Sequence, residues 1–156
     1  MNRSSGPVLI AYDGSDDARA AVAAAGGLLR AQPAVVACVW TPIATSASAA
    51  TLGAPAAVAF AGADRLDAAA RDTAQALAGE GAALAREAGL EAEPRAVEGA
   101  GAPWHAIVRC ADELDAGVIV SGTRGRSTFA AAVLGSTAQG LLHHANRPVL
   151  VVAHER

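Results

Sequence analysis

Short apolar runs alternate with longer amphipathic segments along the whole chain. A continuous apolar run of about four to eight residues, bounded by turn residues, is typical of a strand buried on both faces of a parallel sheet. Residues 90–99, "LEAEPRAVEG", also suggest a strand, but Pro94 cannot donate to a strand ladder, so we expect that strand near a sheet edge. The predicted strands are residues 7–12, 34–40, 90–99, 117–122 and 147–153.

Segments with apolar residues three and four positions apart lie between these runs and predict helices. The first begins after Ser15, a side chain suited to an N-cap, and extends to about Arg30. Another opens with Pro103 near its first helical position, where a missing amide hydrogen costs nothing. The last covers residues 135–145.

The longest amphipathic segment begins at Asp64, and Gly89 is its expected C-terminal glycine. The residues before it, 43–63, are rich in Ala, Ser, Thr and Gly and show no clear period, so we expect a long loop there. The core-facing stripe of the helix is expected to consist of Leu66, Ala70, Thr73, Leu77, Gly81, Leu84 and Ala88.

Strands that alternate with helices predict parallel βαβ units, wound right-handedly, with helices on both faces of the sheet. We therefore expect an α/β fold of three layers, α/β/α, with one domain over residues 1–156. Ligands of such sheets bind beyond the carboxyl ends of the strands, where the winding reverses. The richest strand-to-helix loops are residues 13–17 and 122–128. If their strands are neighbours, the binding crevice lies between these loops.

Composition narrows the function classes. The formal net charge is −3 and there is no basic stripe, which argues against a general nucleic-acid-binding protein. All twelve basic residues are arginine, which excludes a P-loop or a Schiff-base lysine. No apolar run approaches the ~20 residues of a membrane-spanning helix. The N-terminal run is too short for a signal peptide, so we expect a cytoplasmic protein without membrane contact. Cys38 and Cys110 lack metal-ligand spacing and are expected to be buried hydrophobes.

The starts of the predicted helices differ in their suitability for an anion. A helix N-terminus attracts anions because its first amides lack partners and its dipole is positive there. Asp16 and Asp17 open the first predicted helix, and Asp64 and Asp67 open the second, so both should repel a phosphate. The helix that begins near Ser136 opens without acids and offers the cleanest site.

Glycines and arginines gather before that helix. Gly122 and Gly125 follow the fourth strand, where backbone would approach a ligand closely. Alternatively, these glycines serve only to form a strand-to-helix turn; the dinucleotide pattern GxGxxG does not occur. The candidate polyphosphate site comprises the amides of Gly122 and Gly125, Gly135, the hydroxyls of Ser136 and Thr137, and the planar cations of Arg124 and Arg126.

The spacing of these residues resembles a known motif. Gly122, two residues, Gly125, nine residues, then Gly135 and Ser136 match the G-2x-G-9x-G-(S/T) motif of the ATP-binding branch of the universal stress protein family. "VLIAYDGS", "GVIVSGTRGR" and "LLHHANRPVLVV" also resemble segments of that family. The resemblance implies a five-stranded parallel sheet of order 3-2-1-4-5, of the adenine nucleotide alpha hydrolase-like type, with the first and fourth strands adjacent.

The resemblance also implies roles for individual residues. Asp13 would lie by the sugar and adenine of ATP, the backbone of Val39 would meet adenine, and Ala11 would line the pocket. A divalent ion, Mg²⁺ or Mn²⁺, would bind the phosphate oxygens, with Asp13 as the candidate protein ligand. The family further implies a homodimer paired through the last strand, Pro148 to Val152. Ribose and phosphates would contact Gly122, Arg124, Gly125, Gly135, Ser136 and Thr137.

Three functions follow as hypotheses. One is a nucleotide-dependent regulatory or stress-response homodimer that hydrolyses ATP slowly or not at all. The others are a stress-response dimer that binds no nucleotide and acts through protein contacts, and a weak nucleotide hydrolase. Asp13 is the one carboxylate that we place in the crevice, while His143 and His144 are expected near the far end of the last helix. No catalytic residue is therefore assigned, and the bulky Tyr12 is expected to serve packing.

Overall fold

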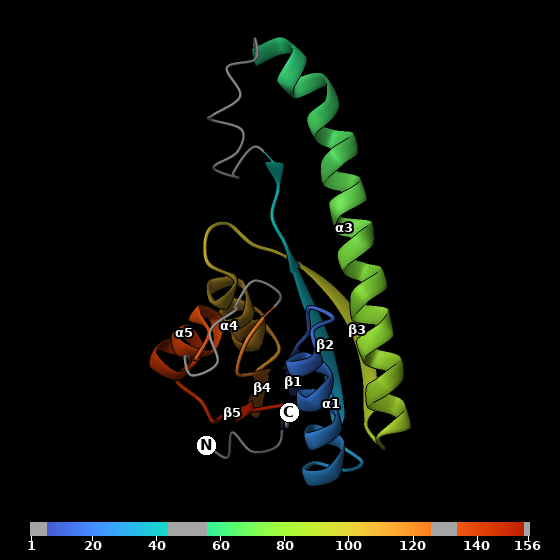
Figure 1. The fold of residues 1–156 in the computed structure, drawn as a ribbon, viewed down its shortest axis with the longest axis vertical. Helices are drawn as coiled ribbons and strands as arrows, with labels where there is room; N and C mark the ends of the chain where they lie inside the picture. Colours follow the sequence, from blue (N-terminus) through green and yellow to red (C-terminus); the bar gives the residue numbers. More distant parts are fainter. Residues whose placement is uncertain (1–5, 44–55, 126–133, 155–156) are drawn as a thin grey trace.

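The computed structural model describes residues 6–43, 56–125 and 134–154, with the backbone alone for 56–61. Five parallel strands form one sheet in the order β3-β2-β1-β4-β5 (Figure 1), which confirms the predicted α/β fold and strand order. The strands are β1 (Val8–Ala11), β2 (Pro33–Trp40), β3 (Glu91–Glu98), β4 (Val118–Gly122) and β5 (Val149–Val152). The helices are α1 (Asp16–Leu28), α3 (Ala56–Glu87), α4 (Pro103–Glu113) and α5 (Ser136–His144).

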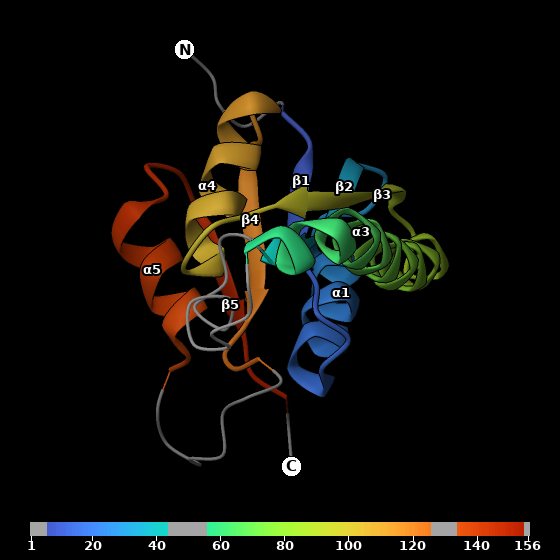
Figure 2. The ribbon, with the colours of Figure 1, turned by 90° about the horizontal axis from the view of Figure 1, so that it is seen from above.

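The helices form two layers, one on each face of the sheet (Figure 2). Val8 and Ile10 pack against the face that α1 and α3 cover, whereas Leu9 packs against the face of α4 and α5. All three side chains are fully buried, which explains why β1 is continuously apolar. Val8 is in register with Ala34 of β2 and Val118 of β4, so β1 is central. The carboxyl ends of β1 and β4 are therefore adjacent, as the predicted crevice requires.

Helix α3 begins earlier than the sequence analysis predicts. Its first residue is Ala56, so residues 56–63 are helical and not part of a loop, whereas 44–55 lie outside the described residues. Alanine has the highest helix propensity and can form a helix without an amphipathic period. The pattern of apolar and polar residues therefore does not indicate this part of the helix. Asp64 and Asp67 consequently lie inside the helix, and the prediction that they oppose an anion at its start is wrong.

The buried face of α3 also differs from the predicted stripe. Leu66 is 56% exposed and Thr73 is exposed, whereas Gly81 of the predicted stripe is buried and Leu77 and Leu84 are partly buried against the core. The other buried positions are small residues outside the stripe, namely Ala74, Ala78, Ala82 and Ala85. The N-terminal part of α3 extends past the other helices (Figure 1), and Asp67 accepts a hydrogen bond there from the amide of Ile43 at 2.8 Å. Small residues allow the C-terminal part to lie close to β2 and β3.

Several predicted boundaries are confirmed. The Ser15 hydroxyl accepts from the amide of Ala18 at 3.2 Å and caps α1, and Gly89 has the left-handed φ of 96° that suits a residue after a helix. Pro103 opens α4, and Pro94 lies in the edge strand β3. No helix within the described residues is long and apolar enough to cross a membrane.

Candidate functional site

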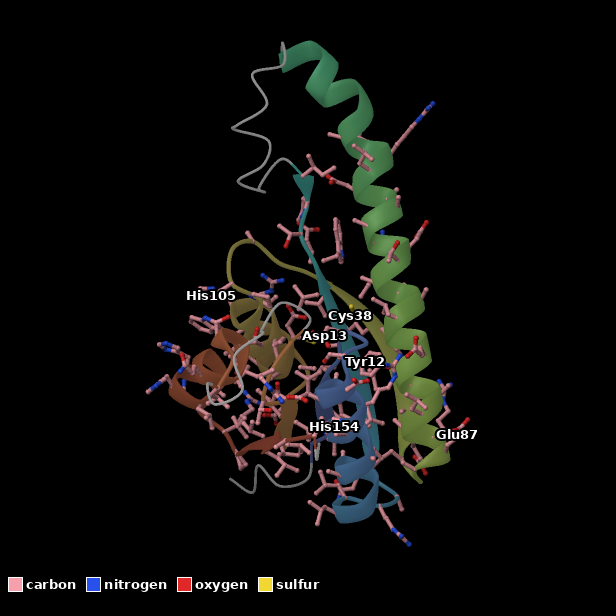
Figure 3. All side chains as sticks on the ribbon, viewed as in Figure 1. Tyr12, Asp13, Cys38, Glu87, His105 and His154 are labelled. Atoms are coloured by element: carbon pink, nitrogen blue, oxygen red, sulfur yellow. The ribbon has the colours of Figure 1, made fainter. Side chains whose placement is uncertain are left out.

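A pocket lies where the carboxyl ends of β1, β2 and β4 meet the N-terminus of α5. Both helical layers contribute to its wall, through Ala18 of α1 and through Pro103 and Ile107 of α4. Figure 3 shows Asp13 between the two layers, with Tyr12 on the side of α3. The remaining lining residues are Ala11, Tyr12, Asp13, Ala37, Cys38, Val39, Ser121, Gly122, Thr123, Arg124, Gly125, Gly135, Ser136, Thr137 and Ala138.

The pocket brings together nine of the residues that the sequence analysis selected. They come from three strands, two loops and a helix start, and they are Ala11, Asp13, Val39, Gly122, Arg124, Gly125, Gly135, Ser136 and Thr137. The tenth, Arg126, lies outside the described residues. The sequence analysis did not select Cys38, Thr123 or Ile107, because their residue types do not distinguish a pocket wall from core.

The turn after β1 directs Asp13 toward Gly125, in the loop that follows β4. Its Oδ1 accepts a hydrogen bond from the amide of Ser15 at 3.0 Å, an Asx turn that fixes the side chain. Its Oδ2 lies on the other side, 2.9 Å from the position that a Cβ on Gly125 would occupy. Gly125 therefore lies against the Asp13 carboxylate, and the two strand-to-helix loops meet at this point.

Helix α3 supports this turn from behind. The Tyr12 hydroxyl donates to Oε1 of Glu80 at 2.6 Å, and Arg19 donates to the same oxygen at 2.7 Å. A second nitrogen of Arg19 donates to the carbonyl of Gly14 at 2.9 Å. Hydrogen bonds from Tyr12 and then from Arg19 lower the pKa of Glu80, so this carboxylate is ionised at neutral pH. Tyr12 is buried and serves packing, as predicted.

The other side of the pocket is the N-terminus of α5. Gly135 is the N-cap residue, and its amide donates to the carbonyl of Thr123 at 2.7 Å, which fixes the start of the helix against the end of β4. The first turn contains no acid, and Ser136 and Thr137 line the pocket. This helix start has the features that the sequence analysis expects of an anion site, a positive helix end with nearby hydroxyls, except that the Gly135 amide is already paired with Thr123.

The surroundings of Asp17 differ from those that the sequence predicts. The sequence analysis assigns it a repulsive role at the start of α1, but its buried carboxylate is matched with donors from the β4–α5 loop. Oδ2 accepts from the hydroxyl of Thr123 at 2.5 Å and from the amide of Arg124 at 3.0 Å. Burial alone would raise the pKa of Asp17, but the bond from Thr123 and the charge of Arg124 together lower it. The negative charge is thus compensated locally.

The histidines that the sequence analysis set aside lie away from the pocket wall. His143 and His144 are in the last turn of α5, as predicted, and the ring of His144 stacks on Trp104 of α4 with centroids 4.3 Å apart. His105 is exposed on α4, on the outer side of that helix layer (Figure 3). Cys38 and Cys110 are both buried, as predicted.

Comparison with known proteins gives one family. The sequence profile described as the universal stress protein family matches residues 5–153. Among the curated proteins, none matches the chain. A universal stress protein from Archaeoglobus fulgidus has 26% sequence identity and a TM-score of 0.68, over 94% of this chain and 98% of that one.

Two further solved structures contain nucleotides. A universal stress protein in complex with cAMP has 28% identity and a TM-score of 0.65, over 96% of this chain and 97% of that one. A universal stress protein from Archaeoglobus fulgidus in complex with dAMP has 24% identity and a TM-score of 0.65, over 96% and 98% of the two chains. At this level of identity the second likeness concerns the fold alone.

Proposed function

The chain belongs to the universal stress protein family, and from this premise we propose that it is an ATP-binding regulatory or stress-response protein. In this proposal it binds ATP with Mg²⁺ or Mn²⁺, acts as a homodimer, and hydrolyses ATP slowly or not at all. Nucleotide occupancy would be the signal that alters its shape or its partners.

One observation carries the nucleotide proposal. Residues separated by more than a hundred positions in sequence, from Ala11 to Thr137, line a single pocket at the topological switch point of the sheet. The pocket has an apolar wall from β1 and β2, suited to adenine, and a helix N-terminus on its other side, suited to phosphate. A family member of 28% identity has been solved in complex with cAMP, which supports an adenine nucleotide as the ligand class.

The donor set is compatible with a divalent ion that is held mainly by the nucleotide. The carboxylate of Asp13 is the acidic group among the described residues that line the pocket. Mg²⁺ is commonly bound by one or two carboxylates together with phosphate oxygens and water, so one carboxylate suffices. Asp13 would serve this ion or the ribose, while Arg124, Ser136 and Thr137 would contact phosphates, and Ala11 and Val39 the base.

The dimer proposal rests on the edge of the sheet. Strand β5 is the terminal strand in the order, so β4 pairs with one of its sides and the other side is an edge. All four of its residues, Val149–Val152, are apolar and only partly buried. An exposed apolar edge strand invites pairing with another chain, and a second copy paired through residues 148–152 would cover it.

The nucleotide proposal is tested by thermal unfolding of nucleotide-free protein with ATP and Mg²⁺, with AMP and cAMP as further ligands and GTP as control. At about 100 times the dissociation constant, a ligand should stabilise the protein by about 2.7 kcal/mol. For a chain of this length that corresponds to a shift of the midpoint by roughly 5–10 °C. A shift with adenine nucleotides and none with GTP supports the proposal.

The variant Gly125→Ala separates binding from folding. The added methyl would lie 2.9 Å from Oδ2 of Asp13, the end of a side chain that can shift slightly, so the protein should fold. The methyl would project into the pocket wall where we propose a phosphate. Gly27→Ala is the matched control, because a Cβ on Gly27 meets nothing within 4 Å. Weaker nucleotide binding in Gly125→Ala alone supports a phosphate site. Equal binding by both variants contradicts a phosphate beside Gly125. No shift with any nucleotide in the parent protein favours a protein that acts through protein contacts.

A further inference from the structure

Helix α1 approaches the end of β4 unusually closely. A Cβ atom on Gly122 would lie 2.7 Å from the backbone carbon of Asp17 and 2.8 Å from its Cβ, distances that real Cβ atoms do not reach. Gly122 is therefore required by the packing of α1 on β4, whatever ligand the pocket takes. This contact places Asp17 directly beside the first residues of the β4–α5 loop.

The Asp17 carboxylate binds three donors of that loop through one oxygen. Oδ2 accepts from the hydroxyl of Thr123 at 2.5 Å, from the amide of Arg124 at 3.0 Å, and more weakly from Nε of Arg124 at 3.4 Å. The side chain of Asp17 is 8% exposed and that of Arg124 is 21% exposed. A charge buried to this extent requires partners, and these three contacts supply them.

The same contacts determine what the loop can offer to a phosphate. The amide of Arg124 donates to Asp17, so the ligand must be bound by other groups of the loop. The guanidinium of Arg124 directs its Nε toward Asp17. Its two terminal nitrogens would therefore be the donors for a ligand. Arg124 lines the pocket while it is held in this way.

We propose that Asp17 is the positioning residue of the phosphate side of the pocket, which it organises by holding Thr123 and the backbone and side chain of Arg124. The proposal rests on the nucleotide-binding function proposed above and adds a residue that lies outside the glycine motif. Asp17 need not contact the nucleotide, because it acts through Arg124. It holds Thr123 and Arg124 in place before a nucleotide binds, and such preorganisation raises affinity by removing the cost of ordering these two residues.

The test is a double-mutant cycle on affinity, measured by calorimetry with ATP and Mg²⁺. Asp17→Ala and Arg124→Gln should each weaken binding by about tenfold or more, the scale of one charge-assisted hydrogen bond. The double variant should bind within about threefold of the weaker single variant, because both changes remove the same arrangement. Asp16→Ala is the matched control: it removes the same charge one position earlier from an exposed side chain, and should leave affinity within about twofold.

The control for folding is urea unfolding of each variant without nucleotide. If Asp17→Ala does not fold, Asp17→Asn takes its place, since an amide oxygen can still accept from Thr123 and from the Arg124 amide while the ion pair is lost. Asp17→Asn should weaken binding by at least about threefold in the parent chain and by less than about twofold in the Arg124→Gln chain.

The outcomes are distinct. The positioning role is overturned if the losses of affinity in the two single variants multiply in the double variant. It is also overturned if an Asp17 variant is less stable but binds ATP as the parent does. Both outcomes leave the nucleotide proposal intact. A parent protein that binds neither ATP with Mg²⁺ nor AMP overturns both. Non-multiplying losses with an unaffected Asp16 control support the positioning role.

Discussion

The hydroxyl of Tyr12 donates a 2.6 Å hydrogen bond to Oε1 of Glu80, which joins the turn after β1 to the middle of α3. Tyr12 also lines the pocket, so this bond connects the pocket wall to the helix behind it. Burial raises the pKa of Tyr12 to about 12, and the bond to Glu80 contributes in the same direction. The folded state therefore requires the neutral phenol.

This raised pKa predicts a loss of stability in alkali. The unfolded chain releases the Tyr12 proton near pH 10 while the folded chain retains it to about pH 12, so the contribution of Tyr12 is complete below pH 10 and is lost as pH rises to 12. The parent should lose about 2–3 kcal/mol of unfolding free energy over that interval relative to Tyr12→Phe. Tyr12 is the chain's one tyrosine, so tyrosinate absorbance reports its titration directly. A midpoint near 10 in the folded protein would refute the buried hydrogen bond.

Two glycines of α3, two positions apart, should respond oppositely to alanine. A Cβ on Gly81 would lie 2.8 Å from the Tyr12 ring and 2.8 Å from Val36, whereas a Cβ on Gly79 meets nothing within 4 Å. Gly79→Ala should stabilise the protein by about 0.5–1 kcal/mol through helix propensity. Gly81→Ala should destabilise it by about 1–3 kcal/mol through overpacking. Urea unfolding measures both, and a shift of the same sign in the two variants would contradict the close packing of α3 on Tyr12.

The order of strands and helices could be predicted largely because the central strands β1 and β4 are buried on both faces. Runs such as 7–12 and 117–122 have no periodicity to misread, and glycine, proline and serine mark the element ends. The start of α3 could not be predicted, because residues 56–63, "AAVAFAGA", contain no alternation of apolar and polar positions. The same composition makes the predicted stripe only partly correct: Gly81 is buried as predicted, but Leu66 is exposed, and Ala78 and Ala82 are fully buried in its place.

The candidate site was predictable where a motif fixes residue types, and not where a residue's role depends on its neighbour. Gly125, Gly135 and Ser136 follow from spacing alone and line the pocket. The role of Asp17 could not be predicted in this way. The sequence shows a charge at a helix start, but the donors that compensate it, on Thr123 and Arg124, are 106 and 107 positions away. The sequence predicts that Gly122 lies close to a ligand. Its packing against α1 could not be predicted, because the contact is with Asp17, which is far away in sequence.

This packing predicts that Gly122→Ala impairs folding. The methyl would be forced to within 2.8 Å of the carbonyl oxygen of Asp17, which is backbone and cannot rotate away. We expect a loss of about 1–3 kcal/mol in unfolding free energy, against a change of less than about 1 kcal/mol for Gly125→Ala. Both are measured by urea unfolding without nucleotide. Equal stabilities would show that α1 can move away from β4 at little cost.

Arg147 joins the C-terminal ends of α4 and α5 ahead of β5. Its Nη1 donates to the carbonyls of Ala111 at 3.0 Å and Ala116 at 2.6 Å, and its Nε donates to the carbonyl of Ala145 at 3.3 Å. Nη2 also contacts the carboxylate of Asp112. The Arg147 side chain is 6% exposed, whereas that of Asp112 is 61% exposed, so the carbonyl bonds are the shielded ones.

The division between shielded and exposed contacts predicts that the carbonyl bonds, and not the ion pair, carry the stability. Lysine keeps the charge of Arg147 but lacks the planar group with several donors that reaches three carbonyls, so Arg147→Lys should cost about 2–4 kcal/mol. Asp112→Asn removes an exposed charge and should cost less than about 1 kcal/mol. Urea unfolding of the two variants decides between them, because a dominant ion pair would reverse the ranking: Asp112→Asn would then be the more damaging change, and Arg147→Lys would be tolerated.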